Sequence, residues 1–146
     1  MRVLVSFITF LWVGNVFAAE PVYTSFFSNK ALGGYDSVAY FTQAKPIPGN
    51  KAMSFQYKGV KWLFSSAENL AKFKANPTKY APQYGGYCAW AVAAKSDLVA
   101  GDPLRWNIIE NKLYLNYDKN IQTKWQKDIS GFIKKADQTW PKLVMQ

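Results

Sequence analysis

The single cysteine is the residue of this chain best suited to chemistry. Cys88 stands in the run Tyr84-Gly85-Gly86-Tyr87-Cys88-Ala89-Trp90-Ala91, where two glycines allow a close approach of the backbone and can turn N–H groups towards an anion. If a helix begins with Ala89, Cys88 lies in its first turn, where the pKa of a thiol is lowered. The segment then offers a redox or nucleophilic thiol, or a soft ligand for a metal such as copper.

Two plainer interpretations of Cys88 stay open beside that one. A free cysteine is often an inert, small apolar residue of a core, and an unpaired cysteine in an exported chain invites a disulfide between two copies. The candidate ligand-binding residues are the glycine segment and one acidic residue upstream of it: Tyr84, Gly85, Gly86, Tyr87, Cys88 and Asp36. Nothing in the sequence places Asp36 within reach of Cys88.

Asp36 and Asp102 are the acidic residues in the most distinctive settings. Asp36 lies among aromatic residues and Asp102 precedes a proline, and we expect both to accept local turn or cap hydrogen bonds rather than to form an acid–base pair. Several aromatic residues near the cysteine could line a pocket, but core packing is the commoner role: Tyr80, Tyr84, Tyr87, Trp90 and Trp106.

Composition excludes several common kinds of site. The chain has 146 residues, one cysteine and no histidine. One cysteine forms neither an intramolecular disulfide nor a multi-cysteine zinc site, and without histidine the chain lacks the commonest general base and metal ligand. The sequence requires no cofactor and shows no recognisable catalytic set, so we favour a binding or accessory protein over an enzyme.

The charge of the chain does not favour nucleic acid as a partner. Its 18 Lys and Arg residues against 9 Asp and Glu give a formal charge of +9. The lysines are spread along the sequence, and Arg105 is the single arginine beyond residue 18, although arginine is the residue that usually recognises phosphate and bases. We therefore interpret the charge as a cationic, soluble surface.

Residues 1–18 have the pattern of a secretory signal peptide. Arg2 gives a positive start, Val3 to Val13 is almost wholly apolar, and Val16-Phe17-Ala18 precedes the expected cut. The apolar run is shorter than the roughly 20 residues that span a bilayer. We expect a periplasmic or secreted protein with no transmembrane anchor after cleavage near Ala18.

The pattern of the remaining chain predicts an α+β fold, a small single domain in which β-hairpins pack against several short helices. Alternation of apolar and polar residues over 53–64 predicts a hairpin with its turn at Gly59, and 106–117 predicts a second hairpin. We expect a lead-in segment over 19–32, one domain over 33–143, and no internal repeat.

The helices are predicted from their caps and spacing. Ser65 with Glu68 fits a capping box, and Asn76 can cap a second helix that stops at Gly85-Gly86. Apolar residues at helical spacing follow Asp118, the expected cap of the last helix, which should break or kink at Ser130-Gly131.

Three stretches of the sequence match a known family. They are Gly34-Tyr35-Asp36-Ser37-Val38-Ala39-Tyr40-Phe41, Tyr57-Lys58-Gly59-Val60-Lys61-Trp62-Leu63-Phe64-Ser65-Ser66 and Asn76-Pro77-Thr78-Lys79-Tyr80-Ala81-Pro82-Gln83-Tyr84-Gly85-Gly86-Tyr87-Cys88-Ala89. Together with Asp102-Pro103, Lys112-Leu113-Tyr114-Leu115-Asn116 and Trp140-Pro141-Lys142-Leu143, they resemble the exported YHS-domain proteins. The resemblance covers about residues 33–143.

The resemblance implies a small module, since more distant YHS domains occur beside metal-transport ATPases and oxygenase components. It implies metal ligands that include cysteines just after the hairpin and one turn into the next helix, where this chain has Ser65 or Ser66 and Asn69. The histidine of the family name has no counterpart either. The exported branch keeps a cysteine after Gly-Gly, here Cys88, and some relatives are described as selenoproteins, which favours a redox role.

Three hypotheses for the function follow. The first is a small exported binding or accessory domain for an unknown small ligand or periplasmic protein, with a concave site near Cys88 lined by Tyr and Trp side chains. The second is a thiol redox protein that uses Cys88. The third is a copper-binding protein in which Met53, Met145 or acidic residues help Cys88 to hold the metal.

Overall fold

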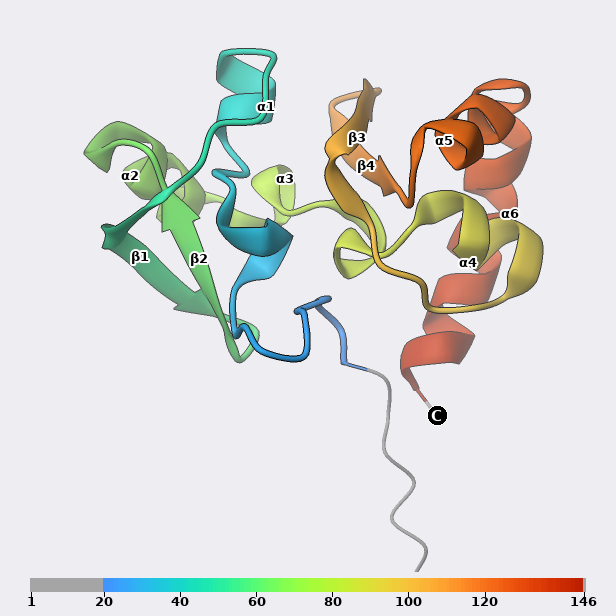
Figure 1. Ribbon diagram of the computed structural model, residues 1–146, viewed down its shortest axis with the longest axis horizontal. Helices are drawn as coiled ribbons and strands as arrows, with labels where there is room; N and C mark the ends of the chain where they lie inside the picture. The colour runs from blue at the N-terminus through green and yellow to red at the C-terminus, as the bar shows by residue number, and fades with distance from the viewer. Residues whose placement is uncertain (1–19, 146) are drawn as a thin grey trace, which may run out of the picture.

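Two antiparallel β-hairpins with short helices around them make up the structure (Figure 1), so the predicted α+β fold is confirmed. The computed structural model describes residues 20–145, and the predicted signal peptide lies outside the described residues. In chain order the elements are η1 (Ala31–Gly34), α1 (Ala39–Thr42), β1 (Asn50–Tyr57), β2 (Val60–Phe64), α2 (Ala67–Ala75), α3 (Pro77–Tyr80), η2 (Gln83–Gly86), α4 (Ala89–Lys95), β3 (Asp102–Ile109), β4 (Lys112–Asn116), α5 (Lys119–Gln126) and α6 (Ile129–Val144). Within this range, no helix has both the length and the apolar character that a membrane span needs.

Both predicted hairpins are present. β1 pairs with β2 and β3 pairs with β4, each pair antiparallel. The first turn places Lys58 and Gly59 at positive φ (49° and 75°), and the second does the same with Glu110 and Asn111 (49° and 59°). Two successive residues with positive φ are typical of the two-residue turn whose twist matches that of the paired strands.

The second half of the chain repeats the first half at a constant spacing of 52 residues, so the expectation that no internal repeat exists is wrong. β3 begins at Asp102 and β1 at Asn50, and 102 − 50 = 52. The same spacing separates the starts of η1 and η2, β2 and β4, α2 and α5, and α3 and α6. Each half thus consists of a short helical turn, a helix, a hairpin and two further helices.

Details of the backbone repeat as well. The N–H of Asp36 donates to the carbonyl of Ile47 and that of Cys88 to the carbonyl of Val99, both at 2.8 Å. Each hairpin carries a register shift near the start of its first strand. Few residues are identical at this spacing, which hides the repeat in the sequence: Gly33 and Gly85, Gly34 and Gly86, Tyr35 and Tyr87, Ala39 and Ala91, Gly49 and Gly101, Leu63 and Leu115, Lys72 and Lys124.

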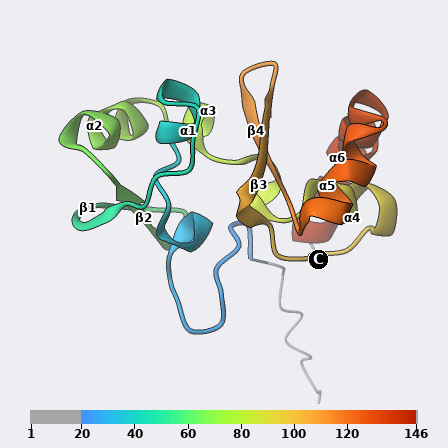
Figure 2. The same cartoon turned by 45° about the horizontal axis from the view of Figure 1, so that its top comes forward.

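Each half has its own apolar core around one fully buried aromatic ring. Phe73 of α2 packs on Trp62 in the first half, and Trp125 of α5 packs on Tyr114 in the second, with ring centroids 4.9 and 5.5 Å apart. β4 separates the two cores because its side chains alternate: Leu113 and Leu115 belong to the first core, and Tyr114 belongs to the second. Figure 2 shows the β3–β4 hairpin standing between the two halves.

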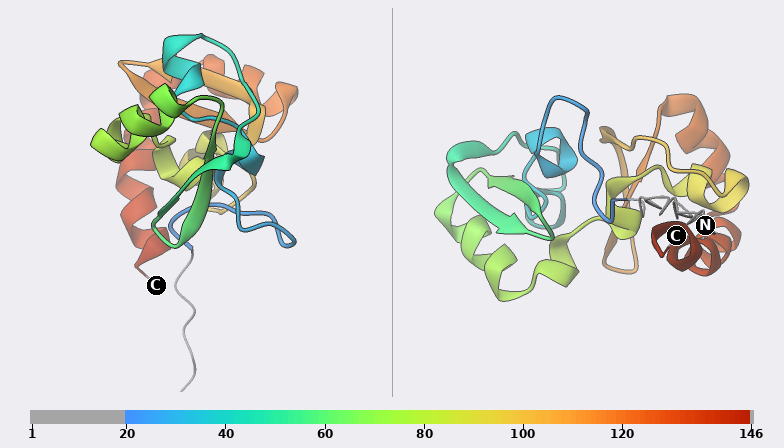
Figure 3. Two further views of the ribbon diagram at one scale, coloured as in Figure 1. Left: turned by 90° about the vertical axis from the view of Figure 1, so that its left-hand side faces the viewer. Right: turned by 90° about the horizontal axis from the view of Figure 1, so that it is seen from below.

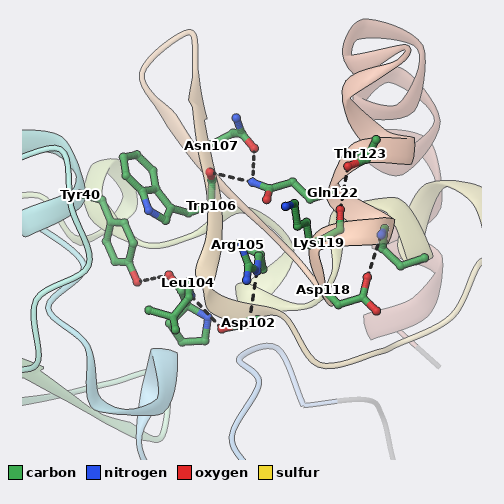
Figure 4. A network of polar contacts seen from close by, with 12 residues as sticks. Tyr40, Asp102, Leu104, Arg105, Trp106, Asn107, Asp118, Lys119, Gln122 and Thr123 are labelled. Carbon is green, nitrogen blue, oxygen red and sulfur yellow. Dashed lines mark hydrogen bonds and ion pairs between the residues drawn. The ribbon is translucent and has the colours of Figure 1, made fainter.

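Contacts from both sides hold β3 in this central position (Figure 4). Tyr40 of the first half donates its hydroxyl to the carbonyl of Pro103 (2.9 Å). From the second half, Nε2 of Gln122 donates to the carbonyl of Trp106 (3.1 Å) and to Oδ1 of Asn107 (2.8 Å). The β3–β4 hairpin of the second half therefore contacts elements of both halves.

The first described residues join the two halves on another side. The N–H of Tyr23 donates to the carbonyl of Gly85, and the N–H of Lys61 donates to the carbonyl of Asn29, both at 2.9 Å. Seen from below, this segment runs between the two halves (Figure 3, right). Gly85 must be glycine here, because a Cβ would lie 2.0 Å from the carbonyl oxygen of Pro21.

The caps of the helices agree with the sequence at two positions and differ at three. Asn76 caps α3 and Asp118 caps α5, as predicted. The cap of α2 is Ser66, because Ser65 is engaged elsewhere. α3 ends at Tyr80, before the two glycines, and the break between α5 and α6 lies at Lys127-Asp128 because Asp128 accepts the N–H of Gly131 and starts a new helix.

Candidate functional site

The buried carboxylate of Asp36 organises the first half. Oδ1 accepts hydrogen bonds from the N–H groups of Val38 (2.9 Å) and Ala39 (3.3 Å). Oδ2 accepts three more, from the N–H of Ser65 (2.8 Å), the hydroxyl of Ser65 (2.6 Å) and Nδ2 of Asn69 (2.8 Å). Asp36 therefore ties the start of α1 to the start of α2. The predicted local hydrogen bonds are confirmed with Val38 and Ala39, whereas the bonds from Ser65 and Asn69 join distant parts of the chain and were not predicted.

These contacts do not fit the metal that the sequence resemblance implies. The places of the expected cysteine ligands hold Ser65 or Ser66 and Asn69. Ser65 and Asn69 donate hydrogen bonds to Asp36, and Ser66 caps α2 by accepting the N–H of Asn69. A carboxylate that already accepts five hydrogen bonds has no lone pair left for an ion. Between residues 20 and 145, no group of three or more Asp, Glu, Cys or His side chains could hold a metal ion.

Cys88 is the residue of the second half that corresponds to Asp36, 52 positions earlier. Its side chain is likewise 0% exposed, and it is the N-cap residue of α4 rather than a residue of the first turn. Its thiol lies 3.6 Å from Oδ1 of Asn116 and donates to it. The residues 52 positions beyond Val38, Ala39 and Ser65 are Trp90, Ala91 and Tyr117. The N–H of Trp90 donates to Oδ1 of Asn116 (3.2 Å), and the side chain of Cys88 accepts no cap hydrogen bond from α4.

Burial raises the pKa of the Cys88 thiol above its ordinary value, so the lowered pKa expected from the sequence is wrong. The backbone N–H groups of Ala91, Tyr117 and Trp90 act in the opposite direction, because they favour a thiolate. The loss of hydration outweighs them. At neutral pH the thiol therefore stays protonated, and it is a weak nucleophile.

A cavity of about 190 Å³ lies beside the sulfur of Cys88. Its lining residues are Cys88, Trp90, Ala91, Lys95, Val99, Tyr117 and Ile121. Tyr117 and Ile121 stand at the positions of Ser65 and Asn69, the two residues whose side chains bond to Asp36 in the first half. Tyr117 is 53% exposed, so its ring lies largely outside the core.

A second cavity, of about 280 Å³, is the central cleft between the two halves. Four aromatic side chains from both halves line it, namely Tyr57, Trp62, Tyr84 and Trp140. Lys58 is the one charged residue of this lining, and its ammonium group lies 5.7 Å from the ring centroid of Tyr57. The cleft therefore combines aromatic side chains with polar residues such as Thr78 and Gln83 and with the positive charge of Lys58.

Two polar groups of these aromatic side chains already have partners in the protein. Nε1 of Trp62 donates to the carbonyl of Tyr57 (3.0 Å), and the hydroxyl of Tyr84 donates to Oδ1 of Asp137 (2.8 Å). Burial, strengthened by the bond to Asp137, raises the pKa of Tyr84 far above its ordinary value. Tyr84 therefore acts as a neutral wall of the cleft rather than as an acid or base.

The structure separates the ligand-binding candidates that the sequence grouped together. Tyr84 and Gly85 line the central cleft, whereas Cys88 lines the smaller cavity. Tyr87 packs between Tyr23 and Trp140 and donates its hydroxyl to the carbonyl of Glu20 (3.1 Å). Gly86, which has a positive φ of 85°, is buried and lines neither cavity, and Asp36 belongs to the other half.

Sequence reasoning missed Asn116, the residue closest to the chemistry of Cys88. Asn116 is 0% exposed, and its Oδ1 accepts the N–H of Trp90 at 3.2 Å. Its Nδ2 has no hydrogen-bond partner in the described part of the chain. In the 52-residue repeat, Asn116 corresponds to the buried Phe64 of the first half. Alignment of the two halves at this spacing would have singled out this amide at a core position.

Comparison with known proteins gives one match. Residues 38–84 match the model of the YHS domain family. The match covers α1 to α3 of the first half and ends inside η2, so that α4 and all later elements lie outside it. Neither the curated proteins nor the solved structures include a match to the chain.

Proposed function

Residues 38–84 of this chain are a YHS domain, and we propose that the protein is an exported binding or accessory module with its ligand site in the central cleft. The observation that carries this proposal is the composition of the cleft: four aromatic walls from both halves with Lys58 as the charged residue of the lining. Concave sites with apolar walls and a few polar groups are the usual form of small-molecule sites.

The shape and charge of the cleft indicate the class of ligand. A volume of about 280 Å³ is at the lower end of ligand pockets, which hold roughly 300–1,000 Å³, so it suits a molecule of one or two rings. Aromatic walls favour a flat apolar body, and the ammonium group of Lys58 favours an anionic substituent. We therefore propose a small aromatic acid.

Titration with indole-3-acetate tests this proposal, with the neutral indole-3-acetamide as the matched probe. We expect saturable binding of the acid, weaker binding of the amide, and a loss of about tenfold in affinity for the acid in Lys58→Gln, since a partly desolvated charge pair is worth about 1.4 kcal/mol. Lys74→Gln is the control, because Lys74 lies over Phe55, outside the cleft lining. Equal binding of acid and amide by all variants would contradict the proposed charge selection.

Export is the second part of the proposal, and it is supported by the charge, the apolar run and the small residue at 18 in the N-terminal sequence. Expression of the full chain in a bacterial host, followed by fractionation and mass measurement, tests it. We expect a periplasmic species that begins at Ala19. Recovery of the uncleaved chain in the cytoplasm would contradict export.

A further inference from the structure

Phe26 and Phe27 are the most exposed of the large apolar side chains between residues 20 and 145, at 95% and 96% exposure. The two rings contact each other edge to face, with centroids 4.9 Å apart. Neither ring belongs to either apolar core. Contiguous apolar surface that stays exposed in a folded protein marks a contact with a partner or with a membrane.

The loop that carries this pair is held at both ends. The N–H of Tyr23 donates to η2, and the carbonyl of Asn29 accepts from β2, both at 2.9 Å. Between these anchors the N–H of Ser28 donates to the carbonyl of Ser25 (2.9 Å), which closes a turn with the two phenylalanines at its tip. Figure 3 (left) shows this blue loop projecting from the body of the molecule. The turn therefore presents both rings to solvent on a fixed projection.

The accessible charges of this part of the chain are positive. Lys30 follows the turn, and its backbone pairs with that of Lys61. Between Glu20 and Glu68 the single acidic residue is Asp36, which is buried and already accepts five hydrogen bonds. All charged side chains of this stretch that reach solvent are lysines, namely Lys30, Lys45, Lys51, Lys58 and Lys61.

We infer that the turn with Phe26 and Phe27 is a membrane-docking site, which inserts its two rings into the surface of an anionic bilayer. Apolar side chains that enter the boundary of headgroups and acyl chains bind a protein to a membrane in proportion to the area they bury. Lysines next to them are attracted by anionic headgroups. The contact is peripheral and needs no membrane-spanning helix.

The shape of the turn favours a bilayer over a second protein as the partner. A convex tip of two rings enters a deformable lipid surface directly, whereas a protein partner needs a pocket shaped to hold both rings. The proposal is independent of the ligand assigned to the central cleft.

Sedimentation of the protein with lipid vesicles tests the proposal. The probe is a vesicle of equal parts phosphatidylglycerol and phosphatidylcholine, and a vesicle of phosphatidylcholine alone is the neutral comparison. We expect weaker binding to the neutral vesicle and partial release from the anionic vesicle at high salt. In the double variant Phe26→Ser/Phe27→Ser, affinity for the anionic vesicle should fall by about tenfold or more, since burial of one such ring alone contributes about that factor.

Two further variants separate the turn from the rest of the surface. Tyr117→Ser removes an aromatic side chain of the second half that is 53% exposed, and it should bind as the wild type does because the turn is intact. Lys30→Gln should lose about fivefold in affinity for the anionic vesicle and should bind the neutral vesicle unchanged. All variants are compared as full chains from one host, so that residues 1–19 contribute equally to each.

The double variant is expected to fold, because its two substitutions lie outside both cores, and its thermal unfolding midpoint checks this. Equal affinity of the wild type and the double variant for anionic vesicles would overturn the proposal. A wild type that binds no vesicle would overturn it as well. Self-association of that wild type, abolished in the double variant, would then assign the turn to a contact between two copies of the chain.

Discussion

The two halves of this chain have the same backbone arrangement and carry different functional groups, a carboxylate and a thiol, at equivalent positions. In the first half, a buried carboxylate at Asp36 satisfies five donors. In the second half, a buried thiol at Cys88 donates to Asn116, whose Nδ2 has no partner among the described residues, and a cavity lies beside the thiol. The comparison shows that equivalent backbone positions hold a fully hydrogen-bonded carboxylate in one half and a protonated thiol beside a cavity in the other.

The largest expected effect concerns the centre of each core. Phe73→Ala and Trp125→Ala each remove a fully buried ring at equivalent positions, and each should lower the free energy of unfolding by about 3–5 kcal/mol. Urea denaturation monitors both variants. If one of them cost less than about 1 kcal/mol, the two cores would not be equivalent in the energetics of the fold.

A smaller but still large effect is expected at Asp36. Asp36→Ala leaves buried donors of Ser65 and Asn69 without an acceptor, which should cost about 3 kcal/mol of unfolding free energy. Cys88→Ala, the matched change in the second half, loses only a weak S–H bond and should cost about 1 kcal/mol. Equal losses of unfolding free energy in the two variants, measured by thermal or urea denaturation, would contradict this distinction between the sites at Asp36 and Cys88.

Alkaline pH is expected to act on the second half through Tyr114. Burial, with smaller contributions from the charges of Asp137 and Glu110, raises the pKa of Tyr114 to about 12, whereas an unfolded tyrosine titrates near 10. The unfolded state therefore loses its proton first, and stability present below pH 10 is lost between pH 10 and 12. Tyr114→Phe should reduce this loss without abolishing it, because burial also raises the pKa of Tyr40 and Tyr84, and Trp62→Phe, the equivalent change in the first half, should not reduce it.

The smallest effect is expected at the surface. Glu68 and Lys72 form an ion pair of 2.9 Å on α2, and α5 has Asn120 in place of the glutamate, 52 positions further on. Both partners are solvent-exposed, and such pairs contribute little. Glu68→Gln should leave the thermal midpoint unchanged within error at physiological salt, and a clear drop would show that this pair stabilises the first half.

The sequence was informative where the signal is local. Alternation predicted both hairpins, and Asn76 and Asp118 were identified as caps because their partners lie three residues away. The partners of Asp36 lie 29 and 33 residues along the chain, and no periodicity reveals such contacts. The repeat escaped because its conserved features are backbone angles and packing positions rather than residue identities.

The stability of Cys88→Asp relative to Cys88→Asn between pH 3 and pH 7 tests most directly whether the backbone sites around Asp36 and Cys88 are equivalent. If the backbone around residue 88 accepts a carboxylate as the backbone around Asp36 does, it stabilises the charged form of the aspartate variant. The aspartate variant should then be the more stable at pH 7 and should lose this advantage as the pH falls towards 3. A variant that is less stable than Cys88→Asn at pH 7, and that gains stability on acidification, would show a buried charge without support and would contradict the account.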